Sequence, residues 1–291
     1  MTSHSLTSPT PAVAPRTGRD VARVVTVAVS AVIAVAVSFL GSGAVAGTPV
    51  AEAAGGALAS DATAVAPGGA AFSIWTLIYV GLIALAVWQL LPAHHTDPRQ
   101  RELGWWIAAS MLLNALWIGA IQIDQVGLSV VVIVALLAVL VRVFLGLTAT
   151  APASRLEAVV VDGTMFVYLG WVAVATVANT AAALNSADID PFGWGADIWA
   201  VVILAVVAAV SVVVAFAGRG RLAVAAAMAW GLGWIAVGRT ADDGWNSTPA
   251  AVAAAVAAVV AVVAAVAVRI ATDRGRTRTP ARHRNAGATA A

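Results

Sequence analysis

Aromatic and amide side chains recur at helical spacing in three apolar segments of the chain. Trp75 and Tyr79 are four residues apart, so both rings lie on one face of a helix. Asn114 and Trp117 are three apart and also share a face. A third segment repeats the pattern at Tyr168, Trp171, Ala175 and Asn179. Aromatic walls with a few polar groups are typical of a site for a flat or bulky apolar ligand. Each pair alone fits helix packing equally well.

The chain offers little else that could catalyse a reaction. It has no cysteine, which excludes disulfides, thiolate metal sites and cysteine nucleophiles. It has no G-x-x-x-x-G-K motif, no H-E-x-x-H motif and no serine–histidine constellation. His94 and His95 are adjacent and would point to different faces of a helix, so a metal site is not predicted.

Asp162 is a carboxylate about one turn inside an apolar segment. Acidic residues in membrane helices often form proton or cation relays, which makes Asp162 a candidate coupling site for a secondary transporter. The simpler interpretation is an interfacial residue that reaches back to Arg155 or to headgroup water. We expect the interfacial role.

The composition defines the class of protein. The 291 residues are 61% hydrophobic and 10% charged, whereas soluble domains average about 45–50% and about 25%. Eight apolar runs approach the roughly 20 residues that a membrane-spanning helix needs. They are Val21–Val45, Ala71–Leu91, Trp105–Ile123, Gly127–Leu147, Val159–Leu184, Ile198–Ala217, Leu222–Val237 and Ala250–Ile270, the seventh being the shortest. The sequence therefore predicts an all-α, polytopic integral membrane bundle.

The arginines, which account for all 16 basic residues, test this map independently. With eight spans and a cytoplasmic N-terminus, only Arg239 falls on the outer side, as the positive-inside rule requires. The outer loops instead collect acids, namely Glu52, Asp61, Asp124, Asp188, Asp190, Asp242 and Asp243. A net charge of only +2 excludes an extended nucleic-acid surface. We expect a bacterial inner (plasma) membrane protein, N-in and C-in.

The segments between and beyond the runs are of low complexity. Residues 1–20 and 272–291 are predicted to be disordered cytoplasmic tails. The first run, followed by Ala44-Val45-Ala46, resembles a signal peptide. It is longer than a signal core of about 7–15 residues, so a retained helix is expected. The connection Ala46–Ala70 is rich in glycine and alanine, which is typical of a flexible linker, although its length also fits a lid.

The predicted topology brings the three aromatic segments to a common depth. At about 1.5 Å per residue, Trp75 and Tyr79 lie roughly 6 and 12 Å below the outer surface. By the same count Asn114 and Trp117 lie at roughly 13 and 9 Å. The stripe that ends at Asn179 occupies the outer half of its span. We therefore expect these groups to converge in a pocket beneath the Ala46–Ala70 connection.

The other tryptophans are assigned by their positions in the runs. Those at run ends are predicted to be interfacial anchors, and they are Trp88, Trp105, Trp106, Trp194, Trp199 and Trp245. Trp230 and Trp234 lie inside the seventh run. They fit either an extension of the pocket or close helix packing.

Three motifs resemble one known family. Phe72-x-x-Trp75-x-x-x-Tyr79, Leu113-Asn114-x-x-Trp117 and Tyr168-Leu-x-Trp171-x-x-x-Ala175-x-x-x-Asn179 are similar to those of the tryptophan-rich sensory proteins (TspO/MBR, the translocator or peripheral benzodiazepine receptor proteins). The resemblance covers about Val21 to Asn185. It implies a five-helix bundle that binds tetrapyrroles, sterol-like lipids or benzodiazepine-like drugs under the first loop. The last three runs have no counterpart in the minimal family bundle, so the chain resembles a larger, divergent member.

Together these observations predict a five-helix membrane domain over residues 21–185 and three additional spans over residues 186–271. The expected function is a sensor, receptor or carrier that binds a planar hydrophobic ligand between the second, third and fifth helices. A proton-coupled secondary transporter and a porphyrin-degrading oxidative enzyme stay open as alternatives. The expected partners are the lipid bilayer and a hydrophobic small molecule, with a homodimer also open and nucleic acid excluded. No cofactor is predicted, and porphyrin or haem is considered only as a ligand.

The topology can be tested with reporter fusions. Reporters fused after Thr96, Gly218 and Ala291 should report the cytoplasm, whereas reporters fused after Ala59 and Asp190 should report the outer side, because the arginine bias depends on this alternation. A cytoplasmic signal after Asp190 would overturn the eight-span map.

Overall fold

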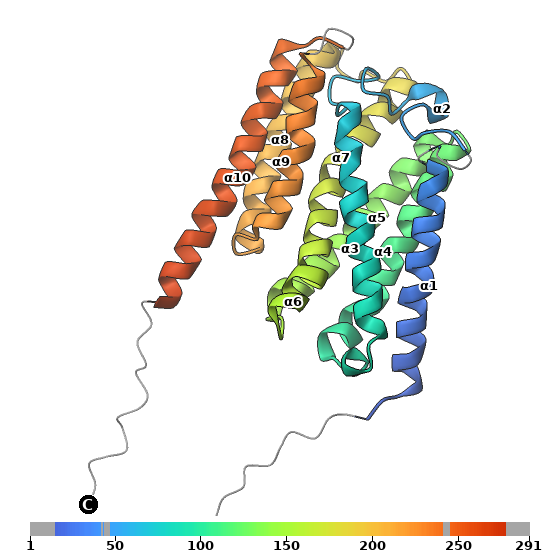
Figure 1. Cartoon of the computed structure of the whole chain (residues 1–291). Coiled ribbons are helices and arrows are strands. Elements are labelled where there is room, and N and C mark those ends of the chain that lie inside the picture. Colours follow the sequence, from blue (N-terminus) through green and yellow to red (C-terminus); the bar gives the residue numbers. More distant parts are fainter. Residues whose placement is uncertain (1–14, 42, 44–46, 241–244, 278–291) are drawn as a thin grey trace, which may run out of the picture.

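The computed structural model of the chain describes residues 15–41, 43, 47–240 and 245–277 (Figure 1). These residues form helices and no strand. The long helices are α1 (Gly18–Gly41), α3 (Ile74–Leu90), α4 (Pro98–Gln122), α5 (Val126–Ala149), α7 (Thr164–Ser186), α8 (Gly195–Ala217), α9 (Leu222–Gly238) and α10 (Thr248–Thr277). The short elements are α2 (Ala53–Gly56), η1 (Gly69–Ser73), η2 (Pro92–His94), α6 (Arg155–Glu157) and the π-helical η3 (Ala158–Gly163). The predicted all-α, polytopic membrane bundle is confirmed.

Seven helical segments in the described part of the chain are long and apolar enough to cross a membrane. The remaining expected span is α9, which has 17 residues. At about 1.5 Å per residue its length is about 25 Å, slightly less than a hydrocarbon core of about 30 Å. It packs against both α7 and α10, alongside the longer helices. The eight expected spans thus correspond to seven long helices and one short one.

Two helices extend beyond the apolar runs that predicted them. α4 begins at Pro98 rather than at Trp105, because the Asp97 side chain caps it by accepting hydrogen bonds from the Arg99 and Gln100 amides at 2.8 and 3.3 Å. This polar first turn carries no hydropathy signal. α10 continues to Thr277, into the segment predicted to be a disordered tail. Residues 1–14 and 278–291 of the two predicted tails lie outside the described residues.

Helix α7 joins two groups of helices. Figure 1 shows α8, α9 and α10 gathered beside the other helices, and α9 is the member that packs against α7. The two backbones approach closely at Gly170, where an added Cβ would overlap the Val224 carbonyl oxygen. Gly231 of α9 faces Val174 of α7, nearer the end of the bundle that carries the α1–α3 connection. We call this end the outer end and the opposite one the inner end, as labels only. Small residues at such crossings allow the close packing that joins helices in a membrane.

The connection between α1 and α3 is packed, which contradicts its interpretation as a flexible linker. Residues 63–68 are buried, and Arg239, at the end of α9, is only 1% exposed. The Arg239 guanidinium donates to the carbonyl oxygens of Ser60, Thr63 (2.6 Å) and Ala66 (3.3 Å). The Gly68 amide donates to the Trp234 carbonyl at 3.0 Å. Arg239 therefore holds the first loop against α9.

A buried ion-pair cluster fixes the inner end of the bundle. Arg99 of α4 pairs with Glu157, and with Asp162 at 2.8 Å, while its Nε donates to the Thr150 hydroxyl at 2.9 Å. Asp162 is 1% exposed. The expectation of an interfacial Asp162 near Arg155 is therefore wrong, since its partner comes from another helix.

The π-helical turn η3 explains how both carboxylates reach one guanidinium. Glu157 and Asp162 are five residues apart, and in an α-helix of 3.6 residues per turn they would point about 140° apart. A π turn closes i→i+5 hydrogen bonds and places such residues on nearly the same side. The geometry of η3 thus turns both carboxylates toward α4.

Removing the shared cation should destabilise the fold strongly. Arg99→Ala leaves two buried carboxylates without their partner, so we expect a loss of about 3–5 kcal/mol in the free energy of unfolding. The control is Arg142→Ala, which removes an exposed ion pair to Glu102 (3.0 Å) and should cost no more than about 1 kcal/mol. Unfolding in detergent, followed by circular dichroism, measures both. Equal, small losses would contradict a structural role for the cluster.

Candidate functional site

Trp75 is the centre of an aromatic cluster in the outer half of the bundle. Its ring is nearly parallel to Tyr79 (5.4 Å between centroids, 22° between planes) and to Trp117 (6.2 Å, 25°). It meets Tyr168 and Trp171 edge to face, at 6.0 and 6.2 Å. These are the favoured geometries of aromatic pairs. The structure therefore brings together the aromatic residues that the sequence pattern singled out on three helices.

The two predicted amides tie this cluster to its neighbours. Asn114 is buried and accepts a hydrogen bond from the Tyr79 hydroxyl at 3.0 Å. Asn179 accepts one from the Trp117 indole at 2.8 Å and donates to the Ser129 hydroxyl of α5 at the same distance. Asn179 thus connects α4, α5 and α7. Both amides serve as the packing contacts that the alternative interpretation described.

Two buried donors in the cluster have no hydrogen-bond partner among the described residues. They are the Trp171 indole nitrogen and the Asn114 amide nitrogen, and both side chains are at most 1% exposed. An unpaired buried donor costs about 1–3 kcal/mol. Of these two side chains, only Trp171 lines one of the two cavities described next. Tyr168, by contrast, donates to the Ser110 carbonyl at 3.2 Å.

The space beside these rings divides into two cavities on either side of Trp75. The smaller cavity has a volume of only about 20 Å³ and is lined by Trp171, Ala175 and Asn179, together with Trp75 and Trp117. It can hold about one water molecule. The expected pocket between the second, third and fifth spans is therefore filled by the aromatic side chains themselves. Sequence spacing places rings on a face but gives no measure of the volume left between them.

A larger cavity of about 580 Å³ lies on the α1 side of Trp75. Its walls are Trp75, Tyr79 and Trp117, facing Val35 and Ser38 of α1. The volume falls within the roughly 300–1,000 Å³ of known ligand sites. Sequence analysis did not assign any residue of α1 to the site, because that helix carries no pair of aromatic or amide residues at helical spacing.

The first loop covers both cavities. Pro49, Val50 and Ala51 line the larger one, while Leu58 and Ala66 line the smaller one. Residues that line the cavities but were not predicted include Phe72, which packs edge to face on Trp171 at 5.8 Å. Phe72 was visible as the first residue of the Trp75 motif, whereas the low-complexity loop gave no such signal.

Neither cavity is charged. Among the residues that the structure describes, no aspartate, glutamate or arginine lines either one. The arrangement therefore suits the apolar body of a ligand, and any charged group of that ligand must lie outside these walls. Asp162 lies in the inner ion-pair cluster and does not line either cavity.

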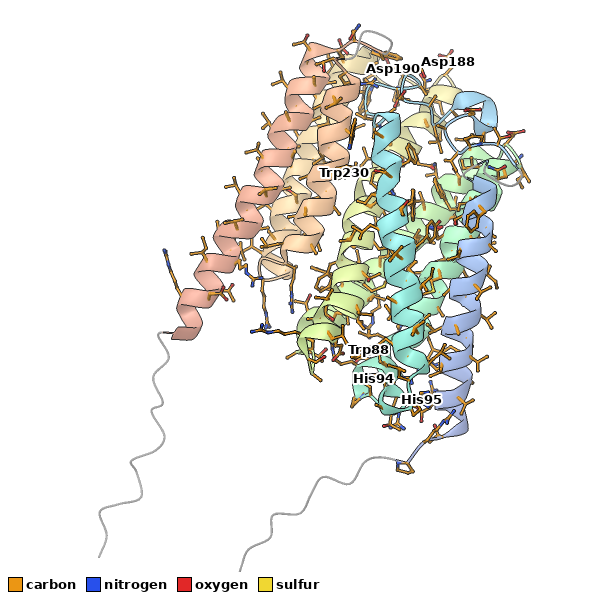
Figure 2. All side chains as sticks on the ribbon, viewed as in Figure 1. Trp88, His94, His95, Asp188, Asp190 and Trp230 are labelled. Atoms are coloured by element: carbon orange, nitrogen blue, oxygen red, sulfur yellow. The ribbon has the colours of Figure 1, made fainter. Side chains whose placement is uncertain are left out.

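Other residues that the sequence singled out make contacts away from these cavities. Trp88 is buried and its ring stacks on His94, 3.8 Å between centroids (Figure 2). His95 Nε2 lies 3.0 Å from the Leu90 carbonyl. Within the described ranges no group of three metal-ligating side chains is found. The Trp230 indole donates to the Ala71 carbonyl at 2.9 Å, so this residue connects α9 to η1, which directly precedes α3.

Comparisons with known proteins identify one family. A family model described as TSPO-like protein matches residues 24–268. No curated protein and no solved structure matches the chain. The matched residues include all of α8 and α9 and most of α10. The resemblance of the three motifs, over Val21–Asn185, did not reach these helices.

Proposed function

The chain belongs to the TSPO-like protein family, and we propose that it is a membrane sensor, receptor or carrier that binds a planar hydrophobic ligand against Trp75. The ligand class is tetrapyrrole-like or sterol-like. The observation that carries the proposal is the uncharged cavity of about 580 Å³, whose lining includes the stacked rings of Trp75, Tyr79 and Trp117.

The shape of the wall favours a flat ligand. The plane of the Trp75 ring lies at 22° to that of Tyr79 and at 25° to that of Trp117, so both pairs are nearly parallel. A rigid planar molecule can continue this parallel arrangement of rings and bury apolar area against it. Each fully buried aromatic wall contributes on the order of 1–3 kcal/mol.

The rim of the cavity favours entry from the lipid. Phe39 of α1 and Val80 and Ile83 of α3 line the cavity and are at the same time 50%, 59% and 44% exposed. Apolar side chains at this depth face hydrocarbon rather than water. A ligand dissolved in the bilayer can therefore reach Trp75 between α1 and α3, while the first loop covers the outer end.

The transporter alternative is not favoured by the position of Asp162. Its carboxylate shares Arg99 with Glu157, away from both cavities. An acid held in this way supports the fold of η3. Oxidative breakdown of porphyrin stays a distinct outcome, recognised by formation of product in light and oxygen.

Removing the aromatic wall should weaken the binding of protoporphyrin IX to the purified protein in detergent. Trp75→Ala and Trp117→Ala should each raise the Kd about 5- to 150-fold, the equivalent of about 1–3 kcal/mol. Trp171→Ala should weaken binding less, because Trp171 does not line the larger cavity and acts only through its edge contact with Trp75. The readout is the change in porphyrin absorbance on binding, because this signal comes from the porphyrin and not from tryptophan fluorescence.

Trp194→Ala is the matched control, since this residue is 45% exposed and lines neither cavity. Circular dichroism must show unchanged helicity, because a large-to-small change can open a destabilising cavity. Equal losses in Trp194→Ala and Trp75→Ala, or unchanged affinity in Trp75→Ala, would refute the proposed site.

A further inference from the structure

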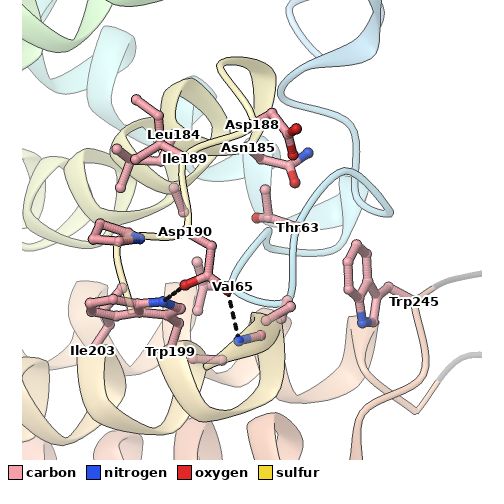
Figure 3. Close-up of a pocket in the computed structure, with 16 residues that line it drawn as sticks. Thr63, Val65, Leu184, Asn185, Asp188, Ile189, Asp190, Trp199, Ile203 and Trp245 are labelled. Carbon is pink, nitrogen blue, oxygen red and sulfur yellow. Dashed lines mark hydrogen bonds between the residues drawn. The ribbon is translucent and has the colours of Figure 1, made fainter. Parts of the chain in front are cut away.

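A separate cavity of about 280 Å³ opens at the outer end of the molecule, where α7 ends and α8 begins (Figure 3). Val65 of the first loop, Leu184 of α7, Ile203 of α8 and Trp245 contribute apolar walls. Its volume is at the lower end of the range of known ligand sites, about 300 Å³, which favours a small ligand. It is distinct from the cavities beside Trp75, with which it shares only Thr63.

Two tryptophans frame this outer cavity. Figure 3 shows Trp199 on one side and Trp245 on the other. Sequence analysis treated both as interfacial anchors, but both are partly buried and line the cavity. The face of an indole ring carries the negative end of a quadrupole and attracts cations.

The carboxylates of this cavity give it a negative charge. Asp190 accepts hydrogen bonds from the Trp199 indole at 2.8 Å and from the Gly195 amide at 2.9 Å. These bonds, with the indole bond the largest contribution, hold the pKa of the Asp190 carboxyl below its usual value, so it stays ionised in mildly acidic solution. Asp188 is exposed and lines the same cavity. Its carboxylate has no hydrogen-bond or ion-pair partner among the described residues.

No cation from the chain compensates this charge within the described residues. No arginine lines the cavity, and the outer Arg239 is buried against carbonyl oxygens of the first loop. Two aspartates within one small cavity therefore face solvent without a counter-ion. A negative, partly apolar cavity attracts positive ligands electrostatically and excludes anions.

We propose that the outer cavity binds a small organic cation, with an ammonium group facing Asp188 and Asp190 and an apolar body between Trp199 and Trp245. This site does not depend on the ligand proposed for the cavity beside Trp75. The ammonium group has two possible sources, a soluble amine or the headgroup of an ethanolamine lipid at the membrane surface.

The test is calorimetric titration of the full chain, in a non-ionic detergent, with benzyltrimethylammonium chloride. We expect saturable binding of one cation per chain that weakens as salt is added, because the attraction to exposed carboxylates is screened. Neopentylbenzene, the neutral carbon isostere of this cation, should bind at least about fivefold more weakly. Absence of saturable binding, or equal binding of the neutral isostere, would overturn the proposal.

A matched pair of variants locates the cation. Asp188→Asn should raise the Kd about two- to fivefold, because it removes one of the two carboxylates that face the ammonium group. Asp124→Asn is the control. Asp124 and Asp188 each follow a helix with a left-handed backbone, at φ 59° and 53°, where asparagine is as well tolerated as aspartate. Asp124 does not line the cavity. Equal effects of the two variants would overturn the assignment.

A further arm separates the two sources of the ammonium group. Adding dioleoyl phosphatidylethanolamine to the detergent should weaken the apparent affinity for benzyltrimethylammonium if the lipid headgroup occupies the cavity. An affinity unchanged by the lipid assigns the cavity to a soluble amine. Either result supports a cation site, provided that Asp188→Asn lowers the affinity in lipid-free detergent.

Discussion

The contact between the Arg239 guanidinium and the first loop determines the organisation of the outer half of this protein. A buried guanidinium needs acceptors, and both terminal nitrogens of Arg239 donate to loop carbonyls at Ser60, Thr63 and Ala66, while its Nε has no partner among the described residues. The loop supplies residues to the cover of the cavities beside Trp75 and one wall of the outer cavity. A single side chain at the end of α9 therefore links the C-terminal helices to both candidate binding sites.

Helix α7 has the corresponding role inside the bundle. Its inner end is fixed through η3 and the Arg99 ion-pair cluster, and its outer half is fixed by Asn179 hydrogen bonds to α4 and α5. Gly170 permits the close approach of α9. In a membrane the hydrophobic effect does not drive helices together, so such polar contacts and close crossings determine the packing. They hold Trp171 and Tyr168 against Trp75.

The sequence predicted the helices and the aromatic cluster well, because hydropathy and spacing along one helix carry that information. Trp75, Trp117 and Trp171 meet as their common depth indicated. The partner of Asp162 was missed, since Arg99 lies in a polar helix turn distant in sequence. The packing of the first loop was missed for a different reason: the acceptors are backbone carbonyls, which no residue type signals. The place of the free volume depends on side-chain packing, which spacing does not determine.

Amide hydrogen exchange of the first loop tests the role of Arg239 most directly. The Ala66 and Gly68 amides are buried and donate to the Thr63 and Trp234 carbonyls at 3.1 and 3.0 Å, so both should exchange slowly in the intact protein. Arg239→Gln should accelerate their exchange by about tenfold or more, the equivalent of about 1.4 kcal/mol of local stability, while amides within α10 stay protected. Rapid exchange of these two amides in the intact protein, or exchange unchanged by Arg239→Gln, would contradict the account.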